Sequence, residues 1–159
     1  EKALEKAVPL ILKTQIVVNG KKTVWAAQYD ENTLKPAAAR KFEPVSLTAG
    51  ESVNIARFLM YDSKPSPEVI DAIESAVEWF RANKIEGVRW ETKGGENRVI
   101  SDKTAPPIWG RFYEIETMRP IFIGRDGVIR YDVMEIEAER RNGYGWYTNE
   151  PNELLEEDF

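Results

Sequence analysis

The stretch 48–82, TAGESVNIARFLMYDSKPSPEVIDAIESAVEWFRA, carries the clearest structural pattern in the chain. Thr48-x-x-Glu51 has the spacing of a capping box, which predicts that a helix begins there. Ser66 followed by Pro67 is a second helix start, because serine is a favoured N-cap and proline suits the first helical position. The stretch therefore predicts two helices that pack as a hairpin across a short proline-containing turn.

Toward the N-terminus, residues 2–16 predict an amphipathic helix in which a proline causes a kink or a late start at position 9. Its apolar face is formed by Leu4, Val8, Ile11 and Leu12. The sequence IVVNGKKTVW (16–25) predicts a β-hairpin, since Asn-Gly between β-branched runs favours a tight turn. Residues 26–47 are irregular, and we expect a long loop of the kind that is usually functional or disordered.

Toward the C-terminus, residues 88–107 contain Gly-Gly and Pro-Pro and are expected to be mostly loop. Residues 108–115 alternate weakly between apolar and polar. If this segment is extended, it places on one face Trp109, Arg111 and Tyr113. Residues 119–141 contain an Asp-Gly turn and then an Asp-x-x-Glu helix start, which predicts a short helix ending near residue 141.

Two residue types are absent from the 159-residue chain, cysteine and histidine. Their absence excludes disulfides, thiol nucleophiles, thiolate metal sites, Ser-His-Asp triads and imidazole acid–base chemistry. Carboxylates, guanidinium groups, amines, hydroxyls and oxygen-ligated cations such as calcium remain. The length suits a single domain over residues 1–159 or one half of a larger one.

The net charge of −5 comes from the C-terminus, where residues 150–159 hold five acids and no base. The other 149 residues contain 22 acids and 22 bases. A neutral body with an acidic tail does not predict a nucleic-acid surface, and no apolar run approaches the length of a membrane span.

Five arginines lie in or beside predicted loops and turns: Arg40, Arg111, Arg125, Arg140 and Arg141. Several guanidinium groups converging on one cleft would suit a polycarboxylate ligand, because each can bind a carboxylate through two hydrogen bonds. The alternative is a set of structural salt bridges, which we favour for Arg140 or Arg141 alone. Aromatic residues in the irregular segments serve either as core anchors or as platforms for sugar rings, and Trp109 and Trp146 are the best candidates for a platform.

Three strings resemble polysaccharide lyase family 10, the pectate lyases, in order and spacing. They are ILKTQIVVNGKKTVWAAQYDENTLKPAAARKFEPVSL (11–47), ESVNIARFLM (51–60) and APPIWGRFYEIETMRPIFIGRDGVIRYDVMEIEAERRNGYGWY (105–147). The resemblance covers nearly the whole chain and implies the C-terminal half of a catalytic module. The implied fold is mainly α, part of an (α/α) toroid with short β-hairpins and long loops, from a secreted bacterial enzyme.

The implied activity is calcium-dependent β-elimination cleavage of polygalacturonate, with an arginine as the base. By resemblance, Arg40 in AARKFEP matches the catalytic arginine, and Arg111 and Arg125 match arginines that hold substrate carboxylates. Trp109 and Tyr113 complete the expected substrate contacts. The aspartates that bind calcium in this family lie upstream of this segment, so the metal ligands within the chain are unknown.

The sequence also departs from the family pattern, because family cysteines and a histidine are replaced at three positions by Thr14, Ala26 and Tyr29. The alternative reading is therefore a catalytically inactive trimmed or engineered scaffold that binds uronates or another protein. A lone half-toroid would expose an apolar face, so we expect either a homodimer or pairing with the missing N-terminal half.

Overall fold

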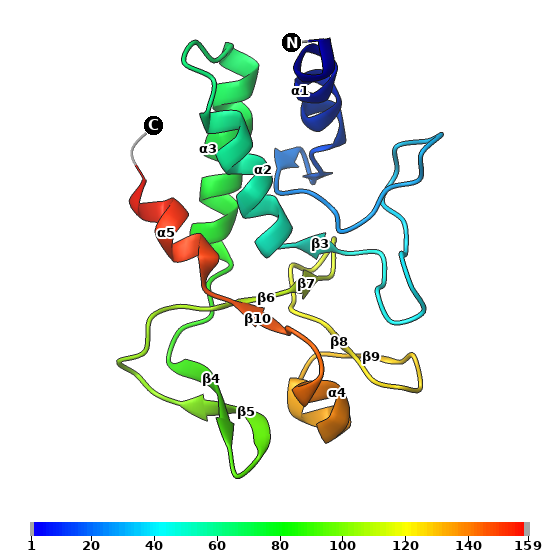
Figure 1. Ribbon diagram of the computed structural model, residues 1–159, viewed down its shortest axis with the longest axis vertical. Coiled ribbons are helices and arrows are strands. Elements are labelled where there is room, and N and C mark those ends of the chain that lie inside the picture. Colours follow the sequence, from blue (N-terminus) through cyan, green and yellow to red (C-terminus); the bar gives the residue numbers. More distant parts are fainter. Residues whose placement is uncertain (1, 158–159) are drawn as a thin grey trace.

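The computed structural model describes residues 2–157, with side chains described from Lys6 onward. Most of the helices lie together at one end of the molecule, whereas short sheets and one small helix occupy the other end (Figure 1). The helices are α1 (Lys2–Thr14), α2 (Gly50–Met60), α3 (Pro67–Ala82), α4 (Ala138–Asn142) and α5 (Glu150–Glu156), with a 3₁₀ turn at Val133–Glu135.

The expectation of a mainly α toroid is wrong for this chain. Helices account for 34% of the structure and strands for 22%, and the described residues form small two-stranded sheets. The strands are β1 (Val17–Val18), β2 (Lys21–Lys22), β3 (Leu47–Thr48), β4 (Val88–Lys93), β5 (Glu96–Ser101), β6 (Trp109–Gly110), β7 (Phe112–Tyr113), β8 (Phe122–Ile123), β9 (Ile129–Arg130) and β10 (Tyr147–Thr148). Segments that look like loops in the sequence pair with one another and thereby satisfy their backbone groups without helix.

The predicted hairpin of α2 and α3 is confirmed. Ser66 is the N-cap of α3, and its side chain accepts a hydrogen bond from the Val69 amide at 3.4 Å. The prediction of a capping box at Thr48 is wrong, because Thr48 belongs to strand β3 and the N-cap of α2 is Ala49. The Thr48 hydroxyl still donates to Glu51, but that contact leaves the first amides of the helix without a side-chain cap.

Helix α1 begins at Lys2 and continues through Pro9, so the late start is not observed; the side chain of Leu4 lies outside the described residues. The hairpin of β1 and β2 is confirmed, with φ of 51° at Asn19 and 78° at Gly20, as its tight turn requires.

The three positions that depart from the family pattern meet in space. The Tyr29 hydroxyl donates to the Thr14 carbonyl at 2.8 Å and accepts from the Ala26 amide at 2.7 Å. Burial raises the pKa of Tyr29 to about 12, so the hydroxyl remains protonated and able to bridge the two backbone groups.

The prediction of a loop at residues 88–107 is wrong over most of that range, because β4 and β5 form an antiparallel hairpin with six paired residues on each strand. Gly94 and Gly95 have φ of 65° and 81°, the left-handed values that a two-residue type I′ turn needs. The Asp-Gly turn between β8 and β9 is confirmed, and the Asp132 side chain caps the 3₁₀ turn that precedes α4.

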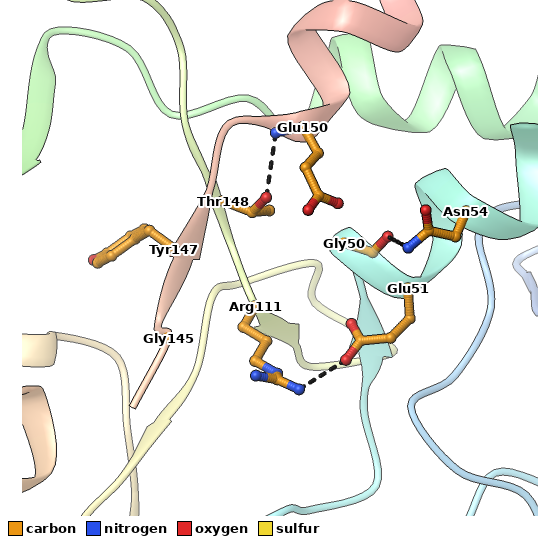
Figure 2. Close-up of a pocket in the computed structure, with 8 residues that line it drawn as sticks. All are labelled: Gly50, Glu51, Asn54, Arg111, Gly145, Tyr147, Thr148 and Glu150. Carbon is orange, nitrogen blue, oxygen red and sulfur yellow. Dashed lines mark hydrogen bonds and ion pairs between the residues drawn. The ribbon is translucent and has the colours of Figure 1, made fainter. Parts of the chain in front are cut away.

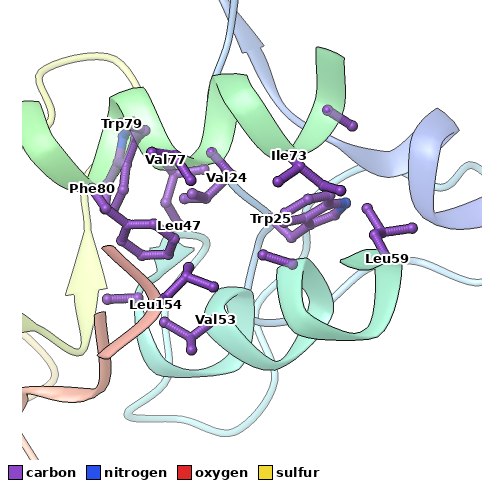
Figure 3. Close-up of a cluster of buried hydrophobic side chains, with 14 of the residues drawn as sticks. Val24, Trp25, Leu47, Val53, Leu59, Ile73, Val77, Trp79, Phe80 and Leu154 are labelled. Carbon is purple, nitrogen blue, oxygen red and sulfur yellow. The ribbon is translucent and has the colours of Figure 1, made fainter. Parts of the chain in front are cut away.

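Two clusters of buried side chains hold the molecule together. The first lies among α2, α3, α5 and the strands beside them, with Trp25, Leu47 and Phe80 near its centre (Figure 3). The second lies among the short sheets and contains Phe122 and Trp146. Over residues 2–157, none of the helices is long and apolar enough to span a membrane.

Candidate active site

Arg40 begins a tight turn that brings its side chain against Glu43. The Glu43 amide donates to the Arg40 carbonyl at 2.8 Å, and the Ala39 amide donates to the Glu43 carbonyl at 3.1 Å. The Arg40 guanidinium pairs with the Glu43 carboxylate through two bonds, Nε to Oε2 at 3.0 Å and Nη2 to Oε1 at 2.5 Å. The hydrogen bond and charge of Glu43 raise the pKa of Arg40, and the guanidinium lowers the pKa of Glu43 to about 2. Arg40 is thus held as a cation.

Glu43 is also bound by Tyr144, which follows α4 in the chain. The Tyr144 hydroxyl donates to Glu43 Oε1 at 2.9 Å, the oxygen that also accepts from Arg40. Burial and the adjacent carboxylate raise the pKa of Tyr144 to about 12, so this donor keeps its proton over the neutral range. One carboxylate therefore connects Arg40 to the segment after α4.

Arg111 lies between β6 and β7 and is fixed by its backbone on two sides. Its amide donates to the Trp146 carbonyl at 2.7 Å, and its carbonyl accepts from the Ala49 amide at 3.2 Å. The guanidinium pairs with Glu51 at 2.8 Å and lies over the Tyr144 ring, with Cζ 4.9 Å from the centroid. Such contacts combine cation–π attraction with an ion pair.

The Arg111–Glu51 pair forms part of the wall of a hollow of about 320 Å³ between the start of α2 and β10 (Figure 2). Its lining is formed by Gly50, Glu51, Asn54, Arg111, Gly145, Tyr147, Thr148 and Glu150. The Arg111 Nε is buried without a hydrogen-bond partner in the described part of the chain.

Arg125 and Arg140 approach the Phe42 ring, which lies in the Arg40 turn. Their Cζ atoms are 5.6 and 5.1 Å from the ring centroid. Arg125 is exposed and pairs with Glu139, whereas Arg140 is only 8% exposed and also lies over the Tyr144 and Trp146 rings.

The structure therefore brings the predicted Arg40, Arg111 and Arg125 into one region, joined by Glu43, Tyr144 and Phe42. Arg141 lies apart from this region and has a structural role. It donates to the carbonyls of Asn97 and Ile136 and pairs with Glu96 at 3.1 Å, which fastens the β4–β5 hairpin to α4. Sequence reasoning misses Glu43 and Glu51 as partners of the arginines: it assigns Glu51 to a capping box and Glu43 to no role, and only their three-dimensional contacts reveal the pairs.

The aromatic residues predicted to contact sugars lie in the core. Trp109 is 0% exposed and its indole donates to the Phe80 carbonyl at 2.9 Å; Tyr113 is 1% exposed and its hydroxyl donates to the Asn83 carbonyl at 3.0 Å. Trp146 is fully buried as well. The segment bends at Arg111, whose side chain is half-exposed, whereas Trp109 and Tyr113 are buried. We therefore leave Trp109 and Tyr113 out of the proposed substrate contacts.

The acidic residues do not form a metal centre within residues 2–157, where no group of three or more could hold an ion. Several aspartates instead stabilise their own loops. Asp30 accepts from the Thr33 amide, Asp102 accepts from the Thr104 amide, and Asp126 pairs with Arg130. The side chains described here therefore do not fit the calcium that the resemblance implies.

Comparison with known proteins shows the same similarity in sequence and in structure. The sequence matches the family described as Pectic acid lyase over residues 1–155. The structure is similar to a family 10 polysaccharide lyase from Cellvibrio cellulosa, with 33% identity and a TM-score of 0.90, over 98% of this chain and 48% of that one. An aspartate-to-alanine mutant of a Cellvibrio cellulosa family 10 lyase, in complex with trigalacturonic acid, gives the same identity and TM-score and is covered over 49%. The chain thus spans about half the length of these structures, and no curated protein matches it.

Proposed function

Because the chain belongs to the pectic acid lyase family, as the resemblance to family 10 indicated, we propose that it acts in the β-elimination cleavage of polygalacturonate. The observation that carries this proposal is the meeting of Arg40, Arg111 and Arg125 around Phe42, Glu43 and Tyr144. Polygalacturonate has one carboxylate on each sugar, and guanidinium groups are the side chains best suited to bind carboxylates. Such a polymer would be met outside the cell, so we propose a secreted protein.

In this proposal Arg111 and Arg125 hold uronate carboxylates and keep the polymer in register. Each is already paired with a glutamate of the chain, Glu51 and Glu139 respectively. Exposed ion pairs of this kind contribute little free energy, so a substrate carboxylate can replace the glutamate at low cost. The hollow beside Arg111 offers space for the incoming group.

Arg40 would act as the base. It would accept the proton next to the uronate carboxylate through a guanidinium nitrogen, while a carbon–carbon double bond forms and the glycosidic bond to the next sugar breaks. The leaving oxygen would take a proton from water. Only a neutral guanidine can accept a proton, and Glu43 raises the pKa of Arg40, so this role requires alkaline conditions.

Calcium, if it takes part, would stabilise the negative charge that builds on the carboxylate in the transition state. Since the described acidic residues do not fit it, we propose that its ligands lie on a segment outside this chain or on a second copy.

A second candidate function is binding of uronates without cleavage. It is favoured by the same Arg40–Glu43 pair, which keeps the base charged, and by the span of about half of the related structures. A chain of this kind would still bind trigalacturonic acid through Arg111 and Arg125.

The test is the ultraviolet absorbance of the unsaturated product from polygalacturonate at alkaline pH with calcium, alongside calorimetric titration of trigalacturonic acid. We expect the Arg40→Ala variant to lose cleavage and keep binding, and Arg111→Ala and Arg125→Ala to weaken binding. Arg98→Ala is the control, because Arg98 is a surface arginine paired with Glu96 on the β4–β5 hairpin. Cleavage by the Arg40→Ala variant would reject Arg40 as the base, and binding without cleavage by the wild-type chain would favour the second candidate.

A further inference from the structure

One oxygen of Glu43 accepts hydrogen bonds from two residues that are far apart in the sequence. Arg40 Nη2 lies 2.5 Å from Oε1, and the Tyr144 hydroxyl lies 2.9 Å from the same atom. The second carboxylate oxygen accepts from Arg40 Nε at 3.0 Å, so all three side chains form one connected unit.

The three members differ sharply in exposure. The Arg40 side chain is 79% exposed, whereas that of Glu43 is 13% exposed. A pair between two exposed, flexible side chains would be weak and incidental. Here the Glu43 carboxylate is largely buried and accepts a hydrogen bond from Tyr144 as well. The orientation of the Arg40 guanidinium is therefore set by a partner that is held in place.

Tyr144 is itself fixed by contacts that do not involve Arg40. The Cζ atoms of Arg111 and Arg140 lie 4.9 and 5.1 Å from its ring centroid, and the Trp146 ring lies 4.9 Å away. Arg140 is buried and also contacts Phe42, the residue next to Glu43. Tyr144 is therefore the packed end of the unit, and Arg40 is its exposed end.

We propose that Tyr144 is a positioning residue that acts through Glu43 to fix the direction of the Arg40 guanidinium over the proposed uronate site. This inference rests on the proposed role of Arg40 and extends it to a residue in the segment after α4. Removing the hydroxyl frees Glu43 to rotate and lets Arg40 move with it. Displacing a reacting group by about 1 Å can cost as much as a hundredfold in rate.

The test compares Tyr144→Phe with Tyr131→Phe. Tyr144→Phe deletes the hydroxyl and keeps the ring that Arg111 and Arg140 contact, so the fold is expected to remain. Tyr131 is a close match elsewhere in the molecule: its hydroxyl donates to Glu114 at 2.8 Å, and the Arg119 Cζ lies 3.6 Å from its ring centroid. Tyr131→Phe removes the same kind of bond without touching Arg40.

The first measurement needs no catalysis. The Arg40 Nε–H resonance is followed by ¹⁵N–¹H NMR and assigned by its disappearance in Arg40→Lys. We expect this resonance to shift and broaden in Tyr144→Phe and to stay in place in Tyr131→Phe. An Arg40 resonance that is unchanged in Tyr144→Phe would overturn the inference, whatever the lyase assay gives.

The second measurement separates positioning from binding. Tyr144→Phe is expected to lower kcat for polygalacturonate about ten- to a hundredfold with KM retained, since Arg111 and Arg125 are untouched. A raised KM with unchanged kcat would overturn the inference by showing that Tyr144 serves binding. If the wild-type chain gives no product, the proposed function fails, and the NMR comparison still decides whether Tyr144 fixes Arg40.

Discussion

At the scale of single residues, the orientation and protonation of each arginine in the site depend on the residues that it contacts. Arg40, Arg111 and Arg125 are chemically identical, yet their partners give them different properties. Arg40 is bound by a largely buried carboxylate, Arg111 lies over an aromatic ring, and Arg125 pairs with a carboxylate that is open to solvent. The Glu43 carboxylate orients the Arg40 guanidinium and raises its pKa, which opposes deprotonation. Glu139 likewise raises the pKa of Arg125, but this partner is itself open to solvent.

The substitution Glu43→Gln tests directly whether Glu43 opposes the deprotonation of Arg40. The amide retains an oxygen that can accept from Tyr144 and Arg40, but the negative charge is lost. Since that charge and its hydrogen bond raise the pKa of Arg40, the pKa falls in the variant and the neutral base becomes available at lower pH. Two other carboxylates of this region, Glu51 and Glu139, are each paired with another arginine, Arg111 and Arg125. The remaining charged groups, Lys41 and Arg140, are cations that lie at the Phe42 ring and favour the neutral form of Arg40.

We therefore expect the alkaline rise of kcat/KM for polygalacturonate to move toward lower pH in Glu43→Gln, measured against the wild type at constant ionic strength. Glu96→Gln, on the distant β4–β5 hairpin, is the control and should leave the profile in place. A profile that does not move would show that Arg40 is not the group whose deprotonation limits the rate.

At the scale of elements, the molecule depends on very short pairings. Most of its ladders join only two residues on each strand, and two of them, β3 with β7 and β6 with β10, connect segments far apart in the chain. Isolated pairs of this length are not stable alone, and the two buried clusters hold them in place. The longest hairpin, β4–β5, is fastened at its turn end by Arg141 and Asn142 of α4.

The turn of that hairpin can be tested at Gly95. An added Cβ at Gly95 meets nothing within 4 Å, so the cost of Gly95→Ala is conformational alone. At φ of 81°, an L residue is disfavoured by about 1–2 kcal/mol, and we expect the free energy of unfolding to fall by that amount. Chemical denaturation followed by tryptophan fluorescence measures it. Gly95→Asn should lose less, because asparagine tolerates this conformation, and equal losses would argue against a left-handed turn.

At the scale of the whole molecule, the large core and the site occupy different regions, although α2 and α5 each contribute their first turn to the hollow beside Arg111. The helical end supplies the large core, whereas the turn of Arg40, the segment around Arg111 and the segment after α4 meet at the end with the short sheets (Figure 1). The described acidic residues are used in loop turns and ion pairs with arginine. Over residues 2–157, this distribution places cations of the chain at the site and forms no cluster of acids that could hold a metal.

We accordingly expect millimolar calcium or a chelator to leave the Tm of this chain unchanged, because a ligand stabilises a protein only if it binds the folded state. Differential scanning fluorimetry with calcium, with magnesium and with chelator provides the measurement. A rise in Tm specific to calcium would place the ligands within this chain and contradict the proposal that they lie elsewhere.

The sequence by itself determined the elements whose signals are local. Ser66-Pro67 fixed the start of α3, and the Asn-Gly and Asp-Gly pairs marked two tight turns, because N-caps and left-handed turns depend on residues adjacent in the chain. The family strings also marked Arg40, Arg111 and Arg125 as candidate site residues. The sequence did not predict β4–β5, because both strands are half-exposed without a clear alternation and a Gly-Gly pair is as typical of a loop as of a hairpin turn.

Tertiary structure alone decided which arginines meet and what holds them. Glu43 and Tyr144 are 101 positions apart, and Arg111 and Glu51 are 60 apart, so no local pattern encodes these contacts. Trp109 and Tyr113 are buried in the core, whereas the sequence predicts that they lie at the surface and contact sugars. Residue type thus determined what chemistry the chain could perform, whereas long-range packing decided where the charges lie and which of them are held in place.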